Sequence, residues 1–146
     1  MKKFLSLLVM MVSVFGIASA ADQIVYNASP LPAQAKSLLA NHFNAKVNFV
    51  KIDKNLLGNV EDYEVVLKNG TEVEFRANGE LKSVDAGANG VPSSLVLPAI
   101  TNYVKKNCKN QKIVELDVEK NHYKIELQDG RELKFDRKGA FLSESR

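Results

Sequence analysis

One short segment holds the residue types that a calcium ion would need. Asp53, Asn55, Gly58 and Glu64 stand at positions 1, 3, 6 and 12 of the loop that supplies oxygen ligands in an EF-hand. Leu57, however, stands where a further oxygen ligand belongs, and no helical pattern flanks the segment. We therefore expect a long hairpin loop here, with no metal site and no other cofactor.

Histidine and cysteine are the other residues that could carry a reaction. A His–Cys nucleophile pair requires the two side chains in contact and a third group that orients the base. His42 and Cys108 each fall at helical spacing with apolar neighbours, which places them on the apolar faces of two helices, as a histidine at the edge of the core and a buried thiol. No phosphate-binding glycine loop and no nucleophile elbow is visible in the sequence. We therefore expect that the protein is not an enzyme.

The N-terminal residues have the pattern of a secretory signal peptide. Lys2 and Lys3 precede an almost wholly apolar run over 4–17, and the small residues 18–20 follow it. The run is shorter than the ~20 residues that span a bilayer. We expect cleavage before Ala21 and a periplasmic or secreted protein with no membrane span.

Charge and cysteine content restrict the range of possible functions further. Without residues 1–20 the chain carries 18 Lys and Arg against 17 Asp and Glu, so it lacks the cationic excess that nucleic acid binding requires. Cys108 is the single cysteine, which excludes an internal disulfide, and no cysteine follows the leader to carry a lipid anchor. We expect a domain held by its apolar core, with no nucleic acid partner.

The sequence after the leader repeats itself. The stretch 31–54 matches 97–120 without a gap, and 61–79 then matches 121–139, with 13 identities in 43 positions. A Leu-Pro-Ala motif starts each copy, and the second block shares a tyrosine, a phenylalanine and two glycines. We interpret the match as a duplication.

Each copy has the pattern of a helix followed by four strands. Pro32 and Pro98 suit the first position of a helix, and apolar residues recur at helical spacing after each. In the second copy, alternating apolar and polar residues predict strands with one dry face, at 114–118, 123–127, 132–136 and from Phe141 onward. The expected fold class is α+β: two tandem repeats, each a helix covering the dry face of a four-stranded antiparallel meander.

The sequence leaves open how the two copies meet. Repeat one spans 21–86 and repeat two spans 87–146, with the joint near 86–90. One copy of about 60 residues is marginal alone, so we expect the two to form one compact unit. Two arrangements satisfy the pattern: the copies pack side by side, or they join edges into one sheet.

The alternation also restricts the turn of the central hairpin. Only a loop with an odd number of residues keeps the apolar residues of both strands on one face. A loop at 68–70 sets Glu64 opposite Glu74, whereas a loop at 69–71 pairs Glu64 with Arg76. We favour the first because it places the glycine third, at the left-handed position. Disfavoured dihedrals cost at least as much as the ~0.2–1 kcal/mol of an exposed charge pair.

The repeated motifs resemble those of the PepSY-like family of secreted bacterial proteins. The resemblance covers essentially the whole chain after the leader, and it implies a tandem arrangement, a fold similar to β-lactamase inhibitory protein and a role in restraining peptidases. The motif residues are core and turn positions, so they carry structure rather than chemistry. They are Leu31-Pro32-Ala33, the block Tyr63-Glu64-Val65-x-Leu67-x-Asn69-Gly70-x-Glu72-x-x-Phe75-x-x-x-Gly79, and the second copies of both.

The wet face of the predicted sheet differs from that of the inhibitor, which binds β-lactamase through an aromatic-rich concave surface. Here that face carries charged residues and no aromatic, and the chain has no Trp, whereas interface hot spots favour Trp, Tyr and Arg. We therefore do not expect inhibition of a β-lactamase, and a solvated sheet face is the simpler interpretation of these charges.

We expect an exported non-enzymatic binding module of the peptidase- or hydrolase-inhibitor type, acting on an envelope protein or peptide through a sheet face or a loop. The alternative is a periplasmic carrier of a small ligand or lipid, which requires a dry cavity of several hundred Å³ in the groove between the repeats. The candidate partner-binding residues are Leu56 and Leu57, in a loop that only the first copy has, and Glu64, Val66, Glu74, Arg76, Lys124, Glu126 and Lys134 on the wet face.

Overall fold

The computed structural model describes residues 22–109 and 111–146, and the signal peptide predicted at 1–20 lies outside the described residues. Within these described ranges, nine strands, two α-helices and two short 3₁₀ helices (η1 and η2) follow one another. In order they are β1 (Gln23–Val25), α1 (Ala33–His42), β2 (Val47–Lys54), β3 (Val60–Leu67), β4 (Glu72–Arg76), β5 (Leu81–Asp85), η1 (Gly87–Asn89), η2 (Ser93–Leu95), α2 (Pro98–Asn107), β6 (Ile113–Val118), β7 (His122–Leu127), β8 (Glu132–Asp136) and β9 (Phe141–Ser145).

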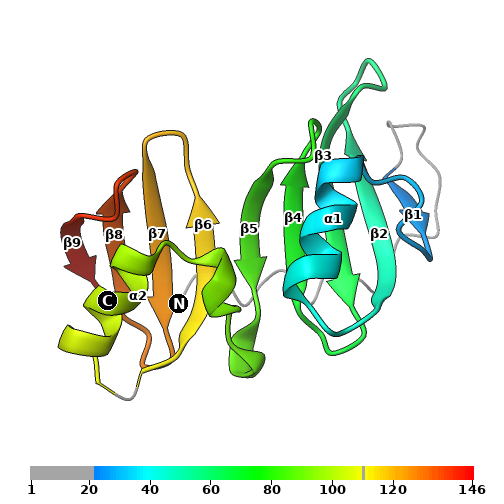
Figure 1. The fold of residues 1–146 in the computed structure, drawn as a ribbon. Helices are drawn as coiled ribbons and strands as arrows, with labels where there is room; N and C mark the ends of the chain where they lie inside the picture. The colour runs from blue at the N-terminus through cyan, green and yellow to red at the C-terminus, as the bar shows by residue number, and fades with distance from the viewer. Residues whose placement is uncertain (1–21, 110) are drawn as a thin grey trace.

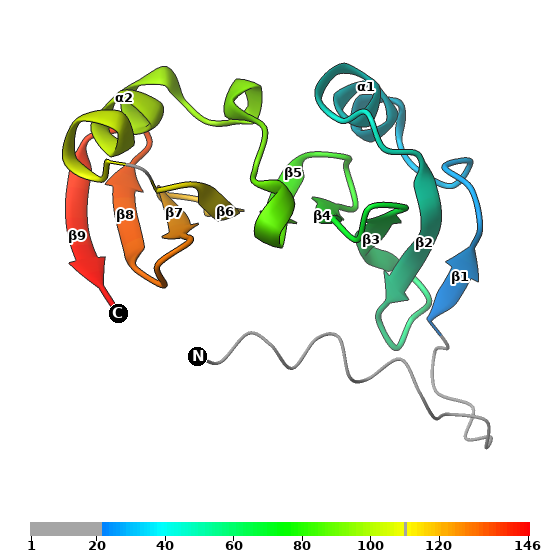
Figure 2. The same ribbon diagram turned by 90° about the horizontal axis from the view of Figure 1, so that it is seen from below.

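The nine strands form one antiparallel sheet, in which each strand pairs with its neighbours in the chain. Both helices lie on the same face of this sheet, and no helix of the described residues covers the other face, called the uncovered face below (Figure 1, Figure 2). The predicted α+β class is therefore confirmed, and four strands follow each helix. Strand β1 was not expected, because a three-residue edge strand is too short to show alternation.

The two halves of the chain, 22–86 and 87–146, join edge to edge. Strand β5 pairs with β6 over three residue pairs, in which Ser83 lies opposite Asp117 and Asp85 opposite Glu115. This pairing makes the two meanders one continuous sheet. It therefore selects the second of the two arrangements that the sequence left open.

The central hairpins have the predicted register. Glu64 lies opposite Glu74 in one half, and Lys124 lies opposite Lys134 in the other. In the first hairpin the loop is 68–70, and its glycine has a φ of 86°. That φ favours glycine strongly, so the turn sets the register of the hairpin despite the like charges that it brings together.

Residues that recur in the two halves meet where each helix begins. Gly79 and Gly139 have φ values of 90° and 87°. A Cβ on Gly79 would lie 2.9 Å from Pro32 Cβ, and one on Gly139 would lie 2.7 Å from Ala99 Cβ. Both glycines are thus required for their backbone conformation and for the close approach of the turn to the helix. Helix α2 starts at its proline as predicted, whereas α1 starts one residue after Pro32.

One apolar core runs between the helices and the sheet. Phe75 and Phe135 are 0% exposed, with Tyr63 and Tyr123 opposite them on the neighbouring strands. Cys108 is buried at the end of α2, as the helical spacing predicted.

Candidate binding surfaces

The β2–β3 hairpin projects beyond the rest of the sheet and carries the predicted leucine pair at its tip (Figure 1). Leu56 is 92% exposed and Leu57 is 86% exposed. The Oδ1 of Asn55 accepts hydrogen bonds from the backbone N–H groups of Leu57 and Asn59, each over 3.0 Å. The turn is therefore held by its own hydrogen bonds, while both leucine side chains face solvent.

The candidate ligands of the calcium-loop match have other partners in this hairpin. Asp53 Oδ1 lies 2.9 Å from Lys51 Nζ, which is also 3.9 Å from a carboxylate oxygen of Glu64. Asn55 Oδ1 already accepts the two backbone hydrogen bonds of the turn. Within residues 22–109 and 111–146, no group of three or more His, Cys, Asp and Glu side chains is placed to hold a metal ion.

The uncovered face of the sheet carries most of the other predicted residues, and charge pairs link them to one another. Lys82 Nζ donates hydrogen bonds to Asp62 (2.7 Å) and Glu74 (3.0 Å). In the second half Lys124 Nζ lies 3.0 Å from Asp117. Of the remaining predicted residues on this face, Glu64, Val66 and Glu126 are half-buried and Lys134 is exposed.

Burial and neighbouring charges shift the pKa of several groups on this face. Burial raises the pKa of Glu64 and of Glu72, and nearby carboxylates add to both shifts. Burial alone would lower the pKa of Lys82, but hydrogen bonds to Asp62 and Glu74 raise it above its usual value. A partner that docks here would have to compete with ion pairs made inside the sheet. The leucine tip is therefore the stronger candidate for a protein partner.

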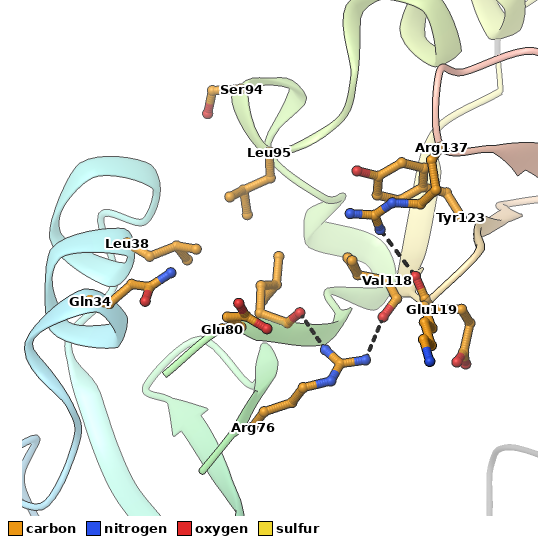
Figure 3. A pocket seen from close by; sticks show the side chains of 12 residues that line it. Gln34, Leu38, Arg76, Glu80, Ser94, Leu95, Val118, Glu119, Tyr123 and Arg137 are labelled. Atoms are coloured by element: carbon orange, nitrogen blue, oxygen red, sulfur yellow. Dashed lines mark hydrogen bonds between the residues drawn. The ribbon is translucent and has the colours of Figure 1, made fainter. Parts of the chain in front are cut away.

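A groove lies between the two halves, on the side of the sheet that the helices cover. It has a volume of about 650 Å³, within the range of pockets that hold small molecules. Apolar side chains from both halves line much of it: Leu38 of α1, Leu95 of η2, and Leu81, Val118 and Tyr123 of the sheet (Figure 3).

Arg76, which lies opposite Asp62 on the neighbouring strand, also lines this groove. Its guanidinium donates one hydrogen bond to the carbonyl oxygen of Leu81 (2.9 Å) and one to that of Val118 (2.8 Å). The β5–β6 pairing ends at Ser83 and Asp117, and Arg76 connects the two strands beyond that point. The guanidinium of a residue that strand alternation assigns to the wet face therefore reaches the groove between the halves.

Arg137 and a contact between His42 and Ser94 were not predicted from the sequence. The Arg137 guanidinium lies over the Tyr123 ring, 4.5 Å from its centroid, and donates a hydrogen bond to the Glu119 carbonyl oxygen (3.0 Å). His42 Nδ1 and Ser94 Oγ lie 2.7 Å apart and connect the end of α1 to η2. No local motif marks either contact, because the partners are 18 and 52 residues apart in the chain.

These features define a class of protein: a single antiparallel sheet with both helices on one face, a projecting apolar hairpin and a groove between its halves. The family described as "Putative beta-lactamase-inhibitor-like, PepSY-like" matches residues 61–143, more than half of the chain. The chain belongs to this PepSY-like family, as the motifs predicted.

Solved structures from Bacteroides species share the fold. One, described as a "putative periplasmic protein of unknown function" from Bacteroides vulgatus, is 33% identical with a TM-score of 0.79, over 86% of this chain and 100% of that one. A "putative calcium-regulated periplasmic protein" from Bacteroides thetaiotaomicron is 29% identical, with a TM-score of 0.79 over 86% and 97% of the two chains. Another "putative periplasmic protein" from Bacteroides vulgatus is 27% identical, with a TM-score of 0.77 over 86% and 97%.

No curated protein matches the chain. The structural neighbours are periplasmic proteins, in agreement with the expected location. In the part of the chain that the structure describes, no helix has the length and apolar character that a membrane span needs.

Proposed function

We propose that the chain is a non-enzymatic binding module, which captures an envelope protein or peptide through the tip of the β2–β3 hairpin. A signal peptide at 1–20 would direct it to the periplasm or out of the cell. The observation that carries this proposal is the exposure of Leu56 and Leu57, 92% and 86%, at the end of a projecting hairpin. The family and the periplasmic neighbours support the location.

The physical argument rests on what the leucine pair would gain in a complex. Burying a leucine side chain is favourable by ~1.5–3 kcal/mol. Single exposed apolar residues are ordinary, but two adjacent leucines on one tip offer a partner a larger apolar anchor. Because Asn55 fixes the turn, binding orders little further backbone. Such a tip suits insertion into an apolar cleft of the partner, which is an inhibitor-type mode of binding.

A comparison of two matched leucine variants tests this proposal. The processed wild-type chain, Leu57→Asp and Leu142→Asp would each be immobilised and exposed to the envelope fraction. Leu142 is 54% exposed on β9, far along the chain from the hairpin, and serves as the control. We expect Leu57→Asp to lose a captured protein that the wild type and Leu142→Asp retain. Both variants should keep the wild-type melting temperature, since exposed substitutions usually change stability by less than about 0.5 kcal/mol. Equal capture by all three proteins would exclude the hairpin tip.

A second candidate function is the binding of a small ligand in the groove between the halves. The observation that favours it is the volume of about 650 Å³ with side chains of both halves in its walls. The two functions use different surfaces, so either one can fail without the other.

We also propose that the two halves arose by duplication. The matching positions of Tyr63 and Tyr123, opposite Phe75 and Phe135, support this origin. The contacts that Gly79 and its counterpart make with the start of each helix support it as well.

A further inference from the structure

We infer that the groove between the halves binds a small amphiphilic anion, a molecule with a carboxylate or phosphate head and an apolar tail. The inference rests on the second function proposed above and names its ligand class. It is carried by two arginines that enter the groove without a carboxylate partner and by the apolar walls beside them.

The first step is the charge state of the two guanidinium groups. Arg76 donates two hydrogen bonds and Arg137 donates one, all to backbone carbonyl oxygens. Neither forms an ion pair with a carboxylate in the part of the chain that the structure describes. A guanidinium has five N–H donors and stays charged. Each arginine therefore retains its full positive charge and further donors for a ligand.

The second step is the rigidity of these groups. Arg76 is half-buried, and two carbonyl oxygens on neighbouring strands, β5 and β6, fix its position. Arg137 lies on the face of the Tyr123 ring, which restricts its guanidinium through a cation–π contact. Pre-positioned guanidinium groups lose little freedom on binding, and their planar fork matches carboxylate and phosphate oxygens.

The third step is the chemistry of the remaining walls. Leu38 extends from α1 and Leu95 from η2 towards the space beside the arginines, as Figure 3 shows. Val118 adds an apolar surface from the end of β6. These side chains would cover a short alkyl or aromatic tail, so that the ligand gains from apolar burial as well as from charge.

Acidic groups at the groove do not cancel its preference for an anionic ligand. Glu80 and Glu119 also line it, and they are exposed to solvent, as Arg137 and Lys120 are, so all four charges are screened. Lys120 adds a third cation to the lining. Among the charged side chains of the lining, the half-buried one is Arg76, and a half-buried charge is screened less than an exposed one.

Isothermal titration calorimetry with four matched probes tests the inference. Octanoate and octyl phosphate carry both head and tail, octanol lacks the charge, and inorganic phosphate lacks the tail. We expect at least one of the two anionic amphiphiles to bind at least tenfold more tightly than octanol and inorganic phosphate. The stronger of the two anionic probes then shows whether the head group is a carboxylate or a phosphate.

Variants of neighbouring residues locate the site. Arg137→Gln should weaken binding of the better anionic probe about tenfold or more, because hydrogen bonds to a charged group are lost. Lys138→Gln, at an exposed position outside the groove lining, should bind as the wild type does. Melting curves of both variants would show that each is folded. Unchanged binding by Arg137→Gln would overturn the inference.

The probes also separate this inference from the function on which it rests. If octanol binds as tightly as the anions, the groove is a ligand site but the proposed ligand class is wrong. If none of the four probes binds at millimolar concentration, both the ligand class and the carrier function fail. Neither result bears on capture of a protein by the leucine tip.

Discussion

Replacement of Glu72 by glutamine should stabilise the folded chain at neutral pH. Glu72 lies on β4, directly opposite Asp85 of β5. Its carboxylate is also repelled by the negative charges of Glu64 and Glu74. It forms no ion pair with any cation in the described ranges. Glu72→Gln keeps the shape of the side chain and removes the repulsion.

The magnitude follows from the position of Glu72 in the sheet. Like charges directly opposite on neighbouring strands are unfavourable by about 0.2–1 kcal/mol. Glu72 is only half-buried, so solvent screening keeps the effect within that range. For a domain of this size, the gain corresponds to a rise in melting temperature of about 1–5 °C.

The pH dependence gives the prediction its sign. Burial first, and then Glu64, Asp85 and Glu74, raise the pKa of Glu72 above its usual value of 4.5. The folded state therefore binds a proton more readily than the unfolded state does. The wild type thus gains stability as the pH falls through the folded pKa towards 4.5. We expect the advantage of Glu72→Gln to be full at neutral pH and to shrink over that window.

Thermal and urea unfolding at several pH values would measure this difference, with Glu144→Gln as the control. Glu144 on β9 lies opposite Leu133 rather than an acidic residue, and its carboxylate lies 3.7 Å from the Arg131 guanidinium. We expect no gain from the control at any pH. The reasoning would be refuted if Glu72→Gln were no more stable than the wild type at neutral pH, or if its advantage were the same in acid.

Three further substitutions and one addition test the fold and the sites. Gly79→Ala should lose more than about 1–2 kcal/mol in urea unfolding, because it combines a positive φ with a contact of 2.9 Å to Pro32. Gly70→Ala, with no atom within 4 Å of its Cβ, should lose only the conformational part, and equal losses would contradict the packing argument. His42→Ala should lower the free energy of unfolding by about 0.5–1.5 kcal/mol through loss of its contact with Ser94, and an unchanged value would show that the contact contributes nothing. Millimolar calcium should leave the melting temperature unmoved, and a clear rise would reveal a calcium site.

The meander and its turns could be predicted because they depend on local periodicity. Alternation over a few residues sets which side of a strand is dry, and a glycine third in the loop sets the register of Glu64 against Glu74. The pairing of β5 with β6 could not be predicted in the same way. The longer strands alternate in the same way, and alternation gives the faces of a strand but not the neighbour at its edge.

The groove and its arginines could not be predicted from the sequence, for a related reason. Alternation assigns Arg76 to the wet face, but its guanidinium connects β5 and β6 where their ladder ends and reaches the groove. Arg137 lies in a turn, where no periodicity applies, and its ring partner Tyr123 is 14 residues away in the sequence. Sites that form where two halves meet depend on the junction, and the sequence did not determine the junction.

The differences between the halves therefore carry more information about function than the similarities do. The shared residues have a structural role, because the proline motif and the last glycine of each block meet at the start of each helix. The offset between the halves drops from 66 to 60 at 55–60, so the six residues that hold the leucine tip have no counterpart. Arg76 likewise aligns with Asp136, which uses its carboxylate to accept hydrogen bonds from its own turn. On the proposed function, partner binding depends on the unmatched positions 55–60. Exchanging them for a two-residue turn should therefore abolish partner capture while leaving ligand binding in the groove unchanged.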